Sequence, residues 1–127
     1  MIDVLFLDDD MSRTKKFISK VPFADTVETA DECINQLDSK HWHIVFLDHD
    51  LGGEIFVDTS NHNTGTTVAR WISENKPSVD MFVVHSFNHP AAKGMLSIIS
   101  SVGYKCVCAP FGGDQFIQLI DVHCGEE

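Results

Sequence analysis

Short apolar runs that end in polar residues recur along the chain. Consecutive apolar positions of this kind are typical of strands buried on both faces, as in a parallel sheet that helices cover on each side. Four runs are strong, at 4–7, 44–47, 81–84 and 106–109, and a weaker one surrounds Thr26 and Val27. The pattern therefore predicts five parallel strands.

Amphipathic segments lie between these runs, and each starts with residues that can cap a helix. Thr29 and Glu32 have the spacing of a capping box, and Pro90 suits the first turn of a helix. The other expected starts are near Asp10 or Ser12, near Asn63 or Thr64, near Asn88 or His89, and at Gly112 to Asp114. Five strands that alternate with five helices predict an α/β fold, a flavodoxin-like three-layer sandwich with strand order 2-1-3-4-5.

The length of 127 residues suits one domain, which we place at 1–124, followed by a short acidic tail at 125–127. The four cysteines lack zinc-like pairing, and we expect free thiols. The N-terminus has no basic, apolar leader, and no run is long enough to span a membrane, so we expect a cytoplasmic protein.

The charge balance narrows the range of partners. Lys and Arg total 9 against 19 Asp and Glu, which gives a net charge of −10. This excess argues against nucleic acid polymers and membranes as partners. A phosphorylated small molecule stays possible, because a bound cation can invert the local charge.

Polar residues follow three of the predicted strands directly. Ligands bind at the carboxyl ends of the strands in such sheets, near the point where the strand order reverses. The residues at these ends are Asp8, Asp9 and Asp10, then Asp48, His49 and Asp50, and finally His85, Ser86 and Asn88. The chemistry of the chain is thus expected at one edge of the sheet.

Carboxylates at neighbouring strand ends repel one another unless they are protonated, solvated or bridged by a cation. The expected metal ligands are Asp8, Asp9, Asp48 and Asp50. Oxygen ligands suit Mg²⁺ or Mn²⁺, and a histidine ligand would shift the preference towards Mn²⁺, Fe²⁺ or Zn²⁺. The alternative is that these aspartates only cap helices and turns.

Two histidines have alternative roles. In a regular strand, His85 and Ser86 point to opposite faces, so only one of them reaches Asp48. His85 is then either a proton-transfer group or a buried core histidine. His49 is either a proton-transfer group or an exposed loop residue, while Trp71 is expected in the core.

The chain resembles a response-regulator receiver domain over nearly its whole length. The matching segments are 5–9, 44–48, Ser86 and 109–111. The resemblance implies that Asp9 binds Mg²⁺ directly and Asp8 through water, that Asp48 accepts a phosphoryl group, and that Asp50 offers a backbone carbonyl. It also implies that Ser86 contacts the phosphoryl group and that a cis peptide precedes Pro110.

Three departures from the receiver pattern bear on function. Ala109 stands where the family has lysine, and Lys105 lies at the other end of that strand. Phe87 replaces a small residue, and a long loop runs from Gly52 to Thr64. These changes argue against ordinary phospho-signalling.

The segments Asp48 to Gly52 and His85 to Asn88 resemble a divergent receiver-like group associated with cyclic-phosphate processing. This resemblance implies a phosphoesterase. The chemistry of hydrolysis separately assigns candidate roles: a cation on Asp9 and Asp48 would activate water, His49 or His85 would transfer a proton, and Ser86 and Asn88 would hydrogen-bond the phosphoryl oxygens. Two other hypotheses stand beside the phosphoesterase. One is a stand-alone receiver that signals through phosphorylation of Asp48 or through a protein partner, and the other is a nucleotide-binding module without chemistry.

Overall fold

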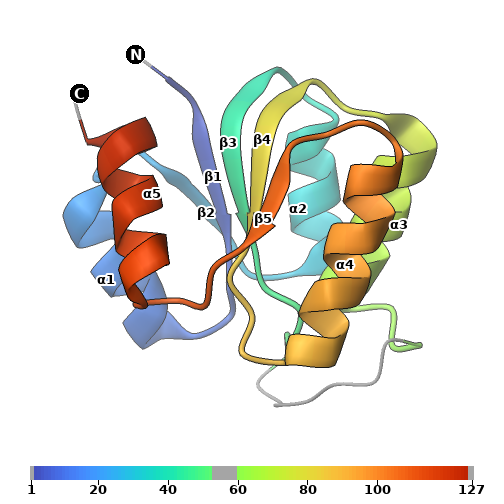
Figure 1. Ribbon diagram of the computed structural model, residues 1–127, viewed down its shortest axis with the longest axis horizontal. Helices are drawn as coiled ribbons and strands as arrows, with labels where there is room; N and C mark the ends of the chain where they lie inside the picture. The colour runs from blue at the N-terminus through green and yellow to red at the C-terminus, as the bar shows by residue number, and fades with distance from the viewer. Residues whose placement is uncertain (1, 53–59, 126–127) are drawn as a thin grey trace.

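The computed structural model describes residues 2–52 and 60–125, and it has the predicted architecture (Figure 1). Five parallel strands form one sheet in the order β2-β1-β3-β4-β5. The strands are β1 (Val4–Leu7), β2 (Asp25–Val27), β3 (Trp42–Leu47), β4 (Val79–Val84) and β5 (Cys106–Cys108). The predicted strand order and fold class are confirmed.

Five helices connect the strands, and each begins at a capping position expected from the sequence. They are α1 (Met11–Lys20), α2 (Ala30–Leu37), α3 (Gly65–Asn75), α4 (His89–Ser101) and α5 (Asp114–Cys124). Their N-caps are Asp10, Thr29, Thr64, Asn88 and Gly113, and Thr29 forms the complete capping box with Glu32. The side chains of the first four caps satisfy backbone N–H groups that a helix start leaves without partners.

Alternate residues of the strands pack into two separate hydrophobic cores, one on each side of the sheet. Leu5, Val45 and Phe82 face α2, α3 and α4, which lie on one side of the sheet (Figure 1). Phe6 and Phe46 face the other side, where α1 and α5 contribute Phe17, Phe116 and Ile120 among others. Successive residues of one strand, including those just beyond its end, therefore alternate between these two sides of the sheet.

Several smaller predictions are settled by the same structure. The cis peptide expected before Pro110 is wrong, because every described peptide bond is trans. Trp71 is half-buried against the core on the α2–α4 side. The cysteines are free, and no helix within 2–52 or 60–125 has the length and apolar character of a membrane span. Positions 53–59 of the long loop and 126–127 of the tail lie outside the described residues.

Candidate functional site

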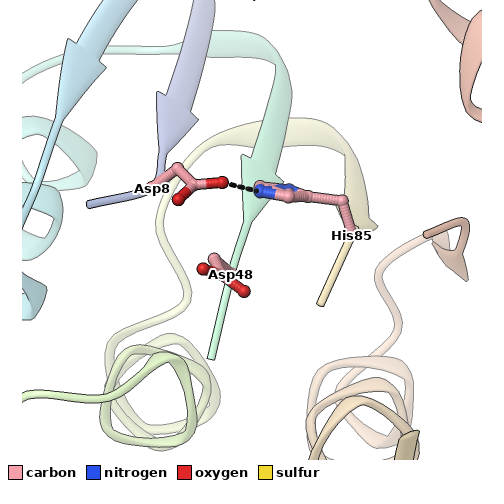
Figure 2. A group of neighbouring side chains, drawn as sticks. All are labelled: Asp8, Asp48 and His85. Carbon is pink, nitrogen blue, oxygen red and sulfur yellow. Dashed lines mark hydrogen bonds and ion pairs between the residues drawn. The ribbon is translucent and has the colours of Figure 1, made fainter. Parts of the chain in front are cut away.

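Asp8, Asp48 and His85 occupy matching positions just beyond the ends of β1, β3 and β4, which we call the row, and their side chains converge (Figure 2). The strand pairing explains this arrangement. Phe46 is paired with Phe6 on one side and with Val83 on the other, and the three site residues each lie two positions further along. All three are buried, and each offers one ligand atom within 4.8 Å of the others. They continue the sheet face that α1 and α5 cover.

The Asp48 carboxylate is the least satisfied group of the row. Its side chain is only 6% exposed. Oδ1 accepts the backbone N–H of His49 at 2.9 Å, whereas Oδ2 has no hydrogen-bond partner among the described residues. Burial, reinforced by the charge of Asp8, raises the pKa of Asp48 from 3.8 to about 8. The group thus stands where a positive charge would be strongly stabilising.

His85 is a buried histidine and also a member of the site, two roles that the sequence presented as alternatives. Its ring stacks on Phe6 with centroids 4.8 Å apart, and its Nε2 lies 3.1 Å from Oδ2 of Asp8. Burial, followed by the charge of Arg13, lowers the pKa of His85 to about 3. The imidazole is therefore neutral near pH 7, and its Nδ1 has no hydrogen-bond partner within the described chain.

Arg13 is a site residue that the sequence analysis missed. It comes from the first turn of α1, and its guanidinium holds Asp8 with two hydrogen bonds, Nε to Oδ2 at 2.8 Å and Nη2 to Oδ1 at 2.9 Å. Nη2 also lies 3.6 Å from Oδ2 of Asp48. The hydrogen bonds to Asp8 raise the pKa of Arg13 further above its usual value. A permanent cation thus lies against the two carboxylates.

His49, Asp50 and Asn88 form a second group beside this row. His49 is fully buried, and its Nδ1 lies 2.9 Å from the hydroxyl of Thr66, whose backbone N–H also donates to it at 3.3 Å. The Asn88 amide donates to Oδ1 of Asp50 at 3.3 Å, and Nε2 of His49 lies 4.0 Å from the same oxygen. His49 is thus a held, buried side chain and not an exposed loop residue, and Nδ1 as acceptor leaves its proton on Nε2.

Two predicted site residues lie elsewhere in the arrangement. Ser86 is buried, and its hydroxyl accepts the backbone N–H of Asn88 at 3.1 Å. Asp9 is half-buried and is not one of the three clustered ligands. Asp9 comes one residue after Asp8, and Ser86 comes one residue after His85. Their side chains therefore start from the other face of the sheet.

The donor set fits a divalent cation. Two carboxylates and a neutral imidazole are ligands that Mn²⁺, Fe²⁺ and Zn²⁺ accept, and the imidazole makes the set less suited to Mg²⁺. The buried Oδ2 of Asp48, which lacks a hydrogen-bond partner among the described residues, is an atom that an ion would satisfy. Arg13 already supplies one positive charge at this place, which shows that the carboxylates accommodate a cation.

Solved structures similar to this chain are receiver domains and response regulators. A Thermotoga maritima response regulator in complex with Mg²⁺ and BeF matches 96% of this chain and 98% of its own, with 18% identity and a TM-score of 0.67. A Burkholderia pseudomallei response regulator with a phosphorylated aspartic acid, a calcium ion and citrate matches 97% and 66%, with 10% identity and a TM-score of 0.64. A receiver domain from Methanospirillum hungatei matches 96% and 90%, with 13% identity and a TM-score of 0.63. At these identities the likeness shows the fold.

Comparison of sequences gives a narrower result. No curated protein matches this chain significantly. The family model described as the cyclic-phosphate processing receiver domain matches residues 4–101, which include every residue of the two groups above. Given this match and the receiver fold, the chain belongs to the cyclic-phosphate processing receiver domain family.

Proposed function

We propose that the protein is a phosphodiesterase that uses a divalent ion to open the ring of a small cyclic phosphate or cyclic nucleotide. Asp8 and Asp48 would hold the ion, with His85 as the third ligand. The observation that supports this most directly is the row of Asp8, Asp48 and His85, three buried side chains with ligand atoms within 4.8 Å. The family description agrees with such a substrate.

Mn²⁺ is the ion that we propose, ahead of Mg²⁺, because the third ligand is an imidazole. To act as a ligand through Nε2, His85 must carry its proton on Nδ1. The ion, when bound, supplies positive charge to the phosphoryl oxygens and acidifies the attacking water. Asp50 would act by holding Asn88 and not as a direct ligand, since its Oδ1 accepts the Asn88 amide.

The reaction itself is a hydrolysis. Water adds to phosphorus, one ring P–O bond breaks, and the leaving oxygen takes a proton, so that the product is a phosphate monoester with a free hydroxyl group. His49 is the group that we propose to donate a hydrogen bond from Nε2 to the leaving oxygen, because Thr66 fixes its Nδ1 as an acceptor and leaves the proton on Nε2. The proton that the leaving oxygen takes comes from the attacking water. Asn88 lies at the N-terminus of α4, and the positive end of the helix dipole there favours phosphate.

The test is hydrolysis of a panel of cyclic nucleotides, followed by chromatography, with Mn²⁺ and with Mg²⁺. We expect turnover that is faster with Mn²⁺ and falls to background in Asp48→Ala. His49→Gln should lower kcat by about 10²–10³-fold, as for loss of a hydrogen-bond donor to charge that develops in the transition state. Asp121→Ala, which removes an exposed carboxylate from α5, is the matched control and should leave the rate unchanged.

Absence of turnover with every metal and every substrate would contradict the enzymatic proposal. A nucleotide that binds tightly and is recovered intact would instead support a binding module.

A second candidate function is phosphorylation of Asp48, as in a signalling receiver with a protein partner. The specific observation in its favour is that Asp48 occupies the end of β3 in a receiver fold, with Oδ2 lacking a hydrogen-bond partner within the described residues. Acetyl phosphate would transfer its phosphoryl group to this oxygen and release acetate. Mass spectrometry should then show one added phosphoryl group that Asp48→Asn abolishes, and an unchanged mass would exclude this candidate.

A further inference from the structure

The row of side chains beyond the strand ends has a fourth position, beyond β5, and the residue there is Ala109. The register between β4 and β5, continued by two residues past Val83 and Val107, pairs His85 with Ala109. Ala109 is fully buried in the core on the α1 and α5 side. None of the four positions of the row therefore carries a cationic side chain, although two of them are carboxylates.

The cation that faces this row comes from α1. Arg13 lies at the third helical position, where the helix dipole disfavours positive charge, so its place there depends on partners outside the helix. Asp8 supplies them through two charge-assisted hydrogen bonds, and Oδ2 of Asp48 is 3.6 Å away. This pairing uses both oxygens of Asp8.

Metal binding and the Arg13 pairing compete for the same atoms. Oδ1 of Asp8 also accepts the backbone N–H of Asp10, and Oδ2 lies against Nε2 of His85. A divalent ion that bonds to Asp8 therefore competes with four partners, of which Arg13 supplies two. The Arg13 side chain is 28% exposed and is not locked into the core. Its guanidinium carbon lies 6.0 Å from the ring centre of Phe87, which is half-exposed.

We propose that Arg13 is the phosphate-binding cation of this site and that it stays bonded to Asp8 until a divalent ion binds. In the metal-free protein it pairs with Asp8 and lies beside Asp48. When a divalent ion takes these carboxylates, the guanidinium is released beside the site, and its fork of N–H groups binds phosphoryl oxygens. The inference rests on the proposed function and adds the residue that recognises the phosphate.

The test uses the full chain with two probes, Mn²⁺ alone and then inorganic phosphate added to the Mn²⁺-loaded protein. Mn²⁺ binding is measured by electron paramagnetic resonance of the free ion, and phosphate binding by ³¹P relaxation. Arg13→Ala should bind Mn²⁺ about 10-fold more tightly than the wild type, because the competing cation is gone. It should bind phosphate about 10- to 100-fold more weakly, as for loss of charge-assisted hydrogen bonds.

Two further variants complete the experiment. Arg13→Lys keeps the charge without the fork and should give intermediate values for both probes. Lys15→Ala removes an exposed cation from the same helix and should match the wild type. Equal binding of both probes by Arg13→Ala and wild type would overturn the inference, as would weaker Mn²⁺ binding in Arg13→Ala, because Arg13 would then serve only to position Asp8.

The inference and the proposed function can fail separately. If the affinities for Mn²⁺ and for phosphate depend on Arg13 as described but no cyclic phosphate is hydrolysed, the inference about Arg13 is supported and the phosphodiesterase activity is excluded. If no variant binds Mn²⁺, both fall. If only Arg13→Ala binds Mn²⁺, Arg13 is confirmed as the competing cation while the metal dependence of the wild type fails.

Discussion

Replacing Gly65 with alanine is expected to lower the free energy of unfolding by about 3–5 kcal/mol and to weaken Mn²⁺ binding. Gly65 is the first residue of α3, and its N–H donates to the carbonyl of His49 at 3.0 Å. A Cβ at this position would lie 2.0 Å from the backbone oxygen of Asp48 and 2.8 Å from Cα of His49. Because these are backbone atoms directly in the site, the helix or the strand end must move.

Gly94→Ala is the matched control, since Gly94 lies inside α4 and an added Cβ there meets nothing within 4 Å. It should raise the free energy of unfolding by about 0.5–1 kcal/mol, because alanine is the better helix former. Thermal unfolding monitored by circular dichroism, with Mn²⁺ titrations of both variants, measures the two effects. If Gly65→Ala had the same stability and the same Mn²⁺ affinity as the wild type, α3 would not pack against Asp48 as described.

The fold could be predicted from local patterns because each pattern has one dominant cause. Unbroken apolar runs require a sheet covered on both faces, and capping residues such as Thr29 and Asn88 mark helix starts through hydrogen bonds to nearby N–H groups. The prediction of a cis peptide before Pro110 was wrong because it was inferred from family resemblance and not from any local requirement.

The site could be predicted only in part. The strand register places His85 beside Asp48, since each lies two residues beyond the paired residues Phe46 and Val83. The alternative of an exposed loop position for His49 is wrong, and local sequence could not exclude it because the burial of His49 involves Thr66, which is 17 residues away in the chain. Long-range contacts of this kind leave no local pattern.

Arg13 was missed because an arginine on a helix usually lies in solvent. The sequence did contain an indication, since a cation in the first turn of a helix opposes the helix dipole. An unfavourable position of this kind suggests that a carboxylate elsewhere compensates for it. Here Asp8, five residues earlier in the chain, does so.

Asp48→Asn is expected to stabilise the metal-free protein, and by more as the pH rises. In the unfolded chain Asp48 titrates near 3.8, whereas in the folded protein burial and Asp8 raise its pKa to about 8. Wild-type stability is therefore lost progressively between about pH 4 and pH 8, as folding comes to require a buried negative charge. Asparagine removes this cost, so we expect a gain near zero at pH 4 and about 1–3 kcal/mol at pH 8.

The pKa of His85, lowered to about 3, makes both proteins less stable as the pH falls below 6.5, and this effect cancels in their difference. Mn²⁺ should reverse the order of stability, because only the wild type offers the Asp48 carboxylate as a ligand. At an Mn²⁺ concentration 1,000-fold above Kd, the wild type gains about 4.1 kcal/mol, which exceeds the gain expected from the substitution. Urea unfolding at pH 5 and pH 8, with EDTA and with Mn²⁺, measures all four cases. A gain in Asp48→Asn that is the same at both pH values, or that survives in Mn²⁺, would mean that this carboxylate is neither buried as described nor a metal ligand.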